Sequence, residues 1–570
     1  MESLESRLTP SSTALSWVDP THLTLSFAPD GASIGNRPNQ LFQTMDALRS
    51  RGDWQTEILR AFQSWAVHSN LNIAVTGDGG QGFGIPGAIQ NDARFGDIRI
   101  GSVQMSSNVI GVTVSPEDFL GGTWVGDVVL NSAKFQPSNP SSLFGTVLHE
   151  AGHVFGLEHS NEPNSVMFPT LNPALTGPSP RDVENLQALH GRRAADSYEG
   201  ELGNSTPALA TSLSTIFAGL NQSGRTPWSF FADITTPSDV DIYSLTVAST
   251  INAPYTFRVQ TAGVSLLAPK VTVTTSQGET LASLTSTKTS GDVLNVTLPR
   301  LTGNTTYYVR VEAARSDVFG VGRYGVALVA NNTSTVNAET IDRVLRGPYG
   351  RLSPIDLQKV FLQPDGPRFN LDAGTNDDAD SATRLGTTPG FALRTRYNTI
   401  ASLEDTGDVD YYRVRSPSTA AGFNGMLTAV TRSFDTNFEA PRIRVFNERG
   451  DRLNTNLIAN GSGQYVVQAE GLEPNDVYFI EVRANMRGPS IGNYQFDVDF
   501  LTRPVELERV GLVNLNQQQS EVTKTLYVGR STLFHMVLNV SSQANSVSNV
   551  GGSIIILDHL GQYVRTLGAR

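Results

Sequence analysis

Apolar and polar positions follow two different patterns along the chain, and the change falls near residue 195. Residues 23–27 alternate apolar and polar side chains, as a half-buried β-strand does. Residues 54–66, 142–155 and 180–190 place apolar side chains at helical spacing, which predicts amphipathic helices. The first third of the chain is therefore predicted to mix α and β structure.

The ends of the predicted helices carry residues that favour helix termini. Ser142 is a suitable N-cap, and Gly191 is a suitable C′ residue after the last helix. Short apolar runs at 71–75, 97–103 and 127–130 predict further β-strands. The helices and strands thus alternate within one α+β domain.

After about residue 196, runs of Thr, Val, Ile and Tyr are separated by Gly, Asn, Asp and Pro, which is typical of antiparallel β-sandwiches. This region also repeats itself. Short segments return in the same order about 170 residues later: 239–243 as 408–412, 268–271 as 440–443, and 322–324 as 492–494. The repetition predicts a duplicated β module.

A third copy of the module begins near the end of the chain. Residues 554–561 resemble both 271–278 and 443–450, but the chain ends before the closing strands. We therefore expect a fragment of a longer protein or a truncated last module. The predicted organisation is an α+β domain at 1–195, β-sandwich modules at 196–335 and 371–503, a linker at 336–370 and a partial third module at 504–570. Short helices are expected in the linker, at 340–345 and 353–361.

Composition narrows the functional classes. Lys and Arg number 42 against 54 Asp and Glu, so the net charge is −12, and no basic tract is present. Such a chain is a poor candidate for binding nucleic acid or anionic membranes. No apolar run approaches the roughly 18 residues of a membrane span. The absence of cysteine excludes disulfides, thiol catalysis and Cys-ligated metals, which leaves the 8 histidines as the informative scarce residue.

Three of those histidines lie close together, in His-Glu-Ala-Gly-His-Val-Phe-Gly-Leu-Glu-His at 149–159. His149 and His153 are one helical turn apart and project from one face, while Gly156 can end the helix and bring His159 back. Three neutral imidazoles with an open fourth position describe a catalytic zinc site. Glu150 is placed to act on water beside the metal.

A weaker interpretation of the five-residue core alone is a surface helix with two solvated histidines. The third histidine and the glycine at the turn favour the metal site instead. Met167 follows within Ser-Val-Met-Phe-Pro, and by itself it would be ordinary core packing.

These residues resemble the metzincin zinc metallopeptidases, and within them the matrixins, the group of the matrix metalloproteinases. Ser160 directly after His159 is the matrixin choice, and Met167 stands at the Met-turn, an apolar floor under the imidazoles. The helix at 180–190 also fits. The resemblance covers about 15–195 and implies a twisted mixed sheet with three helices.

Two departures limit the resemblance. Only His22 and His68 precede His149, so the second, structural zinc of vertebrate matrixins, held by three histidines and an aspartate, is not expected. Latency through a propeptide cysteine is impossible in a chain without cysteine. Asp127 resembles a position near a structural calcium, although a solvated turn aspartate is the preferred interpretation.

The resemblance implies a zinc endopeptidase in which a metal-activated water attacks the peptide carbonyl and Glu150 is the general base. His149, His153 and His159 are the expected ligands of one Zn²⁺. The expected partner is a protein or peptide substrate, bound extended against an edge strand, with a specificity pocket beside residues 159–171. The oligomeric state is left open.

The β modules resemble bacterial pre-peptidase C-terminal domains, which are small sandwiches appended to secreted peptidases. Calcium ligands are possible at the acidic stretch 372–380 and at Asp239, Asp241, Asp408 and Asp410, but capping of strands and turns is the preferred interpretation because no complete oxygen-ligand loop is legible.

Two functions remain open: a zinc endopeptidase with accessory modules, and a surface or extracellular adhesion protein whose peptidase domain is inactive. The intact His149, Glu150, His153 and His159 favour the peptidase. No secretory signal is visible after Met1. We expect secretion or a cell-surface location, with a cytoplasmic location as the alternative.

Overall fold

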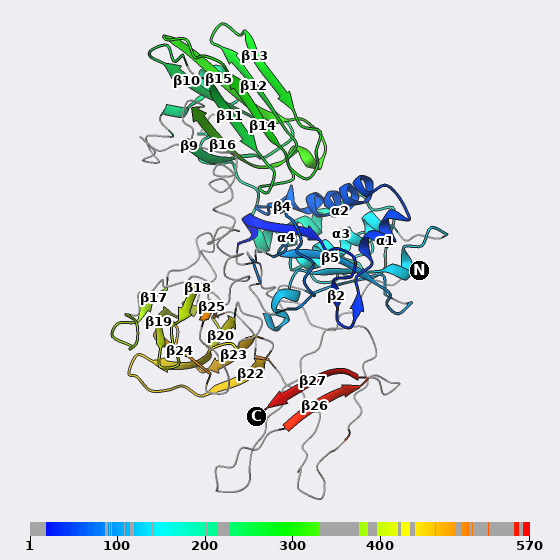
Figure 1. The fold of residues 1–570 in the computed structure, drawn as a ribbon, viewed down its shortest axis with the longest axis vertical. Helices are drawn as coiled ribbons and strands as arrows, with labels where there is room; N and C mark the ends of the chain where they lie inside the picture. The colour runs from blue at the N-terminus through cyan, green and yellow to red at the C-terminus, as the bar shows by residue number, and fades with distance from the viewer. Residues whose placement is uncertain are drawn as a thin grey trace, which may run out of the picture. The chain divides into compact units, whose positions relative to one another are not determined.

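Figure 1 shows the computed structural model of the chain. The structure describes residues 17–214, 216, 228–330, 375–385, 396–500, 504–505, 523, 552–557 and 563–569, except 18, 86–88, 91, 93, 108, 115–118, 139–141, 201–202, 253, 420–422, 434–438, 462 and 486–491. The helices predicted at 340–345 and 353–361 lie outside the described residues. The chain divides into two compact units, one taking in most residues up to Gln358 and the other most residues after it.

The first part of the chain builds one five-stranded sheet with the order β4-β1-β5-β7-β6. Its strands are β1 (Leu23–Phe27), β4 (Ile73–Val75), β5 (Ile98–Val103), β6 (Gly111–Thr113) and β7 (Val128–Asn131). The strands pair in parallel except β6, which runs antiparallel to β7 at one edge. The sheet is therefore mixed, as predicted.

Helices accompany this sheet: α1 (Leu41–Asp46), α2 (Arg51–Ala66), α3 (Leu143–Val154) and α4 (Pro180–His190). The side chain of Ser142 accepts a hydrogen bond from the amide of Gly145, so the predicted N-cap of α3 is confirmed. Ser179 caps α4 in a capping box with Asp182. Gly191 follows α4 with φ +75°, the left-handed conformation that glycine adopts without strain.

The remaining short elements of this part are η1 (Pro20–His22), β2 (Ser33–Ile34), β3 (Arg37–Pro38), η2 (Phe119–Trp124) and η3 (Ser132–Lys134). β2 and β3 form a two-stranded antiparallel pair.

Helix α3 is fixed in the core by large aromatic side chains. Trp65 on α2 is fully buried and donates its indole N–H to the carbonyl of Leu148 at 2.8 Å. Trp17 donates in the same way to the carbonyl of Val154, also at 2.8 Å. Phe62 packs edge-to-face on Phe155, just past the end of α3. The helix that carries the histidine motif is thus held at its middle and at its C-terminal end.

The next part of the chain forms two sheets from strands that follow the predicted alternation. One sheet has the order β13-β12-β15-β10-β8, with β8 (Thr211–Ser212), β10 (Val240–Val247), β12 (Pro269–Thr275), β13 (Thr280–Thr285) and β15 (Thr305–Ala313). The other has the order β14-β11-β16-β9, with β9 (Trp228–Ile234), β11 (Tyr255–Gln260), β14 (Val293–Leu298) and β16 (Gly322–Ala330). Side chains of both sheets meet in one hydrophobic cluster. The short helices η4 (Pro207–Leu209) and η5 (Val318–Gly320) lie in its connections.

The second β region also forms two sheets, but the strand β22 pairs in the sheet opposite to that of its counterpart β13. One sheet has the order β17-β19-β24-β21, with β17 (Thr383–Arg384), β19 (Val409–Arg415), β21 (Arg442–Asn447) and β24 (Val477–Arg483). The other has the order β18-β25-β20-β23-β22, with β18 (Arg396–Leu403), β20 (Met426–Ser433), β22 (Thr455–Gly461), β23 (Gln464–Glu470) and β25 (Gly492–Asp499). Near the end of the chain, β26 (Gly552–Leu557) pairs with β27 (Tyr563–Ala569).

The repeated sequence segments occupy equivalent strands in the two β regions. In the first, the hydroxyls of Tyr243 on β10 and Tyr324 on β16 are 2.7 Å apart. In the second, the hydroxyls of Tyr412 on β19 and Tyr494 on β25 are also 2.7 Å apart. Each pair links the two sheets of its region through a buried hydrogen bond.

The first β region shares contacts with the α+β part inside the same unit. Gln63 on α2 donates its side-chain amide to the carbonyls of Val318 and Val321, at 3.1 and 2.8 Å. Arg193 forms a bidentate ion pair with Asp233, and both side chains are largely buried. The change in the pattern of apolar and polar residues near residue 195 therefore does not coincide with a break in packing.

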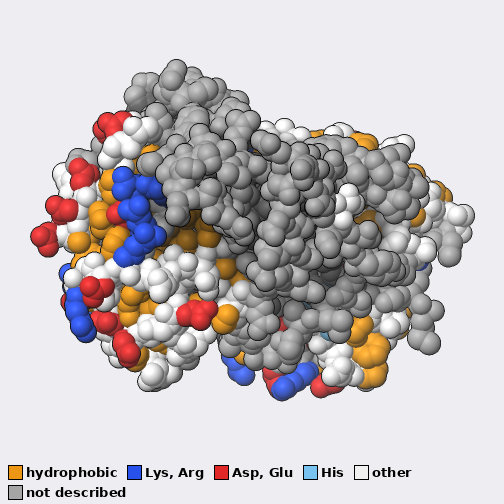
Figure 2. Space-filling model, turned by 90° about the horizontal axis from the view of Figure 1, so that it is seen from below, with side chains coloured by type: hydrophobic (Ala, Val, Ile, Leu, Met, Phe, Trp, Pro, Cys, Tyr) orange, Lys and Arg blue, Asp and Glu red, His pale blue; other side chains and the backbone are white. Residues whose placement is uncertain are grey.

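None of the helices in the described ranges has both the length and the apolar character of a membrane span. On the face drawn in Figure 2, Lys and Arg side chains stand in small groups with Asp and Glu side chains nearby.

Candidate metal centre

Helix α3 places His149 and His153 one turn apart in a completely buried position. The Nδ1 atom of His149 lies 2.7 Å from the carbonyl oxygen of Val166, and that of His153 lies 2.7 Å from the carbonyl oxygen of Leu157. A carbonyl only accepts, so each Nδ1 carries the proton. Each neutral ring therefore presents the lone pair of Nε2.

The helix ends where a third histidine can turn back. Gly156 has φ +84°, its amide donates to His153, and the amide of Leu157 donates to the carbonyl of Gly152 at 2.9 Å. This pair of hydrogen bonds is a Schellman motif, which stops α3 and reverses the chain. The loop that follows carries His159 to the two helical imidazoles, as the glycine predicted.

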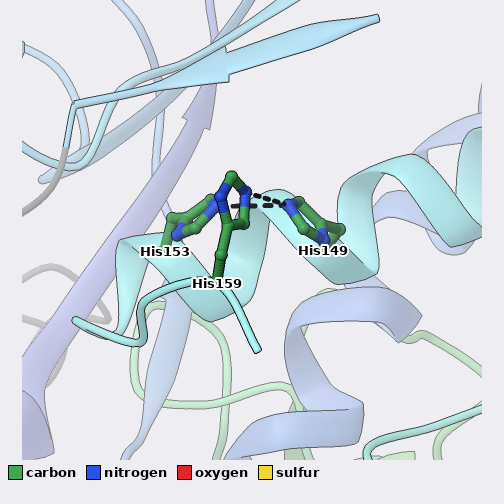
Figure 3. Close-up of side chains that lie close together, drawn as sticks. All are labelled: His149, His153 and His159. Carbon is green, nitrogen blue, oxygen red and sulfur yellow. Dashed lines mark hydrogen bonds between the residues drawn. The ribbon is translucent and has the colours of Figure 1, made fainter. Parts of the chain in front are cut away.

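The three Nε2-bearing rings converge, as Figure 3 shows. The Nε2 atom of His149 lies 3.2 Å from that of His153 and 3.3 Å from that of His159. Two lone pairs that face each other at this distance repel unless a cation lies between them. The three histidines form one of the groups of metal-ligating side chains found among the described residues.

The geometry of these nitrogens fits zinc. Metal–nitrogen bonds of about 2.0–2.1 Å in a tetrahedral site separate the nitrogens by roughly 3.3 Å. The separations of His149 from its two neighbours are close to that value. Neutral imidazoles, fixed in orientation by hydrogen bonds at Nδ1, are the donors that structural and catalytic zinc sites use.

Glu150 lies beside the three histidines without belonging to their group. Its side chain is fully buried, and one carboxylate oxygen accepts a hydrogen bond of 2.7 Å from the hydroxyl of Thr113 on β6. The carboxylate therefore has a fixed orientation between α3 and the edge of the sheet. Neither Thr113 nor β6 was part of the sequence prediction.

Met167 packs closely against α3 at Gly152, which lies between the two helical histidines in the sequence. The close approach is possible because glycine has no Cβ, and the sulfur of Met167 occupies that space. Its carbonyl accepts a hydrogen bond from the amide of Ser160, at 2.9 Å, which ties the loop after His159 to the turn at Met167. The turn thus supports both the helix and the third histidine.

Asp182 on α4 holds the same turn, and sequence reasoning missed it. Its carboxylate accepts hydrogen bonds from the hydroxyl of Ser165 and from the amide of Val166, the latter at 3.0 Å. Val166 in turn provides the carbonyl that binds His149. The available signal was the spacing Ser179-x-x-Asp182, which predicts a capping box but not this second role.

Asp127 does not occupy the solvated turn that was expected. Its side chain is 1% exposed, and one carboxylate oxygen accepts a hydrogen bond from the amide of Arg99. Burial raises the pKa of Asp127 well above its usual value, although the charge of Arg99 opposes this. The preferred interpretation was wrong because Asp127 directly precedes a strand, β7, that is buried along its whole length.

Comparisons with known proteins now bear on this site. Residues 40–191 match the family model described as Matrixin. The match contains α2, α3 and α4, and with them the histidine group and Met167. It covers well under half of the chain.

Curated relatives carry the same indication. A probable matrix metalloproteinase, 095L, of Invertebrate iridescent virus 3 is 28% identical over 153 residues, which are 25% of this chain and 36% of the viral protein. Macrophage metalloelastase of Oryctolagus cuniculus is 30% identical over 145 residues, 25% of this chain and 30% of the rabbit protein. Macrophage metalloelastase of Rattus norvegicus is 43% identical over 60 residues, 10% of this chain and 12% of the rat protein.

The chain thus spans about a third or less of the length of the relatives it matches. The matches indicate a matrixin domain of the metalloprotease class at 40–191, and the histidine group that could hold a metal ion lies inside it.

A second group of metal-ligating side chains lies in the first β region. Oxygens of Glu199, Asp239 and Asp241 are all within 4.8 Å of one another. Burial raises the pKa of Asp241 to about 8, while a hydrogen bond from Tyr324 opposes the rise. Asn204 is fully buried beside them, and a hydrogen bond from its side chain also opposes the rise in the pKa of Asp241.

Proposed function

We propose that the chain is a zinc-dependent metalloendopeptidase. The observation that carries the proposal is the convergence of three histidine nitrogens. In two of the rings, a backbone carbonyl binds Nδ1, so that the lone pair of Nε2 faces the other histidines. The matrixin match at 40–191 supports it, as do the relatives named matrix metalloproteinase and metalloelastase. An inactive adhesion protein has no need of this arrangement together with a buried Glu150.

Different residues of the chain have different roles in the proposed peptide hydrolysis. His149, His153 and His159 would hold Zn²⁺, which supplies Lewis-acid activation of water and of the substrate carbonyl. Glu150 accepts the proton of the attacking water and then gives it to the departing amine. Met167 supports the helix beneath the histidines. The buried walls of α3 exclude bulk water from the proton transfer.

An extended peptide substrate would pair with β6, the antiparallel edge strand of the sheet. A peptide in this position adds a strand beside the residues that hold Glu150. The specificity pocket would lie beside residues 159–171, which include the turn at Met167.

The test is cleavage of a denatured protein by the purified chain, with and without a zinc chelator. We expect cleavage by the wild type and its loss in chelator. Glu150→Ala should lower kcat by several orders of magnitude while zinc stays bound. The matched control is Glu279→Gln, which changes an exposed carboxylate between β12 and β13 and should leave activity unchanged. Cleavage that persists in chelator or in Glu150→Ala contradicts the zinc mechanism.

We further propose that the two β regions are sandwich modules related to pre-peptidase C-terminal domains, within 196–335 and 371–503, with a partial copy at 504–570. Support comes from the paired sheets, the shared hydrophobic cluster in each region and the equivalent tyrosine pairs. Limited proteolysis tests these module boundaries. Cleavage concentrated at 336–370 agrees with a linker there, whereas cleavage inside 240–330 contradicts a folded first module.

Calcium in the first module is proposed at Glu199, Asn204, Asp239 and Asp241. Oxygen atoms from carboxylates and an amide are the ligands that Ca²⁺ prefers, and the buried side chain of Asn204 offers an amide oxygen in addition to the three carboxylates. The second module repeats part of this set, since Asn376 is buried and Tyr494 donates to Asp410 as Tyr324 donates to Asp241.

Calorimetry of the full chain tests the calcium site. Calcium should bind and raise the unfolding temperature of the wild type, and Asp241→Asn should abolish the effect. Asp317→Asn is the control, because Asp317 pairs with Arg315 at the surface of the same module. Absence of both heat and thermal shift overturns the calcium proposal and leaves the zinc site untouched.

We also propose a location outside the cytoplasm, supported by the similarity to proteins named matrix metalloproteinase. Detection of the chain in the medium of its native producer, or only inside the cells, decides it.

A further inference from the structure

Strand β6 turns two of its three residues toward helix α3. Gly111 and Thr113 are buried, and Val112 between them is only partly buried. Side chains alternate along a strand, so Gly111 and Thr113 share the face that meets α3. Glu150 occupies the same space from the helix.

Thr113 and Gly111 hold the carboxylate of Glu150 in complementary ways. The hydroxyl of Thr113 donates to Oε2 of Glu150 at 2.7 Å. A Cβ added at Gly111 would come within 2.9 Å of Oε1 and 3.1 Å of Cδ of Glu150. The threonine therefore fixes one oxygen, and the glycine leaves room for the other.

The strand that carries these two residues is itself anchored. β6 pairs with β7, with Gly111 opposite Leu130 and Thr113 opposite Val128. Asn131, at the end of β7, donates its side-chain amide to the carbonyl of Val109, which lies just before β6, at 2.6 Å. The hydroxyl of Thr113 thus stands at a position set by the sheet, not by a loose loop.

We propose that Thr113 is a positioning residue for the general base, with Gly111 providing the necessary space. The inference rests on the proposed function, because it assigns to Thr113 the orientation of Glu150 in peptide hydrolysis. A carboxylate held at one oxygen still accepts a proton at the other. β6 is also the edge strand with which the substrate would pair. The same strand therefore positions both the carboxylate of Glu150 and the scissile peptide bond.

The first experiment separates the hydroxyl of Thr113 from its shape. Thr113→Val keeps the volume and removes the donor, and it should lower kcat about tenfold or more with KM changed less than about twofold. Thr113→Ser keeps the donor and should restore most of kcat. Zinc content should stay at the wild-type level in both.

The matched control is Thr146→Val. Thr146 lies on α3, is fully buried, and its hydroxyl makes no hydrogen bond within the described residues. Its replacement makes the same change of atoms without removing a hydrogen bond to Glu150, so kcat should remain within about twofold of the wild type. Equal losses in Thr146→Val and Thr113→Val would mean a packing effect and would overturn the proposal.

A second readout needs no activity. In chelator, the urea midpoint is measured for the wild type, Thr113→Val, Glu150→Ala and the double variant. Thr113→Val should lower the midpoint when Glu150 is present and have a clearly smaller effect in Glu150→Ala. Equal effects in both backgrounds overturn the hydrogen bond. Coupling in this cycle with no cleavage by the wild type would instead refute the proposed peptidase activity.

Discussion

Two backbone carbonyls determine how the histidines of the metal centre are protonated. Val166 and Leu157 accept from Nδ1 of His149 and His153, which leaves Nε2 of both rings as a donor of electrons to a metal. Asp182 holds the turn that contains Val166. A residue that touches no metal ligand thus controls one of them.

Asp182→Ala should weaken zinc binding about 10- to 100-fold, because Val166 and the imidazole of His149 lose their fixed orientation. Competition with a chromophoric chelator measures the affinity. Ser179→Ala is the control, since it removes the cap of α4 but keeps the hydrogen bonds of Asp182 to Ser165 and Val166. Equal affinity in Asp182→Ala and the wild type contradicts the prediction.

Asp127 predicts a dependence of stability on pH. Below about pH 4 its carboxyl is protonated in both states; above that, the unfolded chain releases the proton while burial keeps it in the folded chain. The folded state then binds more protons, so the free energy of unfolding falls as pH rises from about 4. Asp127→Asn should flatten this fall in urea titrations at successive pH values; an unchanged slope would show that Asp127 is ionised in the folded chain.

At the scale of elements, the end of α3 has the largest consequence for the site. Gly156→Ala forces an L-residue into φ +84° and should cost about 1–2 kcal/mol of stability. It should also lower zinc affinity, because the loop after the turn carries His159. Gly31→Ala is the control: Gly31 has φ +90° with open space around it and lies in the turn between β1 and β2. Equal zinc affinities in the two variants would contradict the role of the turn.

Elements with local signals were predicted well, and elements that depend on distant partners were not. The three predicted helices are confirmed as α2, α3 and α4 within a few residues. α1 was missed because its first amides, on Phe42 and Gln43, are capped by the carboxylate of Asp30 from another segment. β6 was missed because a three-residue strand that starts with glycine gains its structure only by pairing with β7.

The candidate site shows the same division. The histidine spacing and Gly156 are local features, so the sequence predicted which side chains would meet. Thr113 and Asp182 contact the site from β6 and α4, which are distant in sequence from the histidines. Spacing along the sequence does not predict such long-range contacts.

At the scale of the whole molecule, the ion pair of Arg193 with Asp233 links the α+β part to the first β region. Arg193→Met leaves Asp233 buried without its partner and should cost about 3–5 kcal/mol. Calorimetry of the full chain measures the loss. Arg181→Met is the control, because Arg181 pairs with Glu184 at an exposed site worth about 0–1 kcal/mol. Similar small effects of both variants would mean that this ion pair contributes little to the association of the two parts.

The central claim is that one zinc ion, held by His149, His153 and His159, makes this chain an endopeptidase with Glu150 as its base. The most direct measurement is a titration of zinc into metal-free protein while peptide cleavage is followed. Cleavage should rise and saturate at about one zinc per chain, and Glu150→Gln should bind the same zinc without cleaving. Cleavage without zinc, a requirement for two ions, or an active Glu150→Gln would contradict the account.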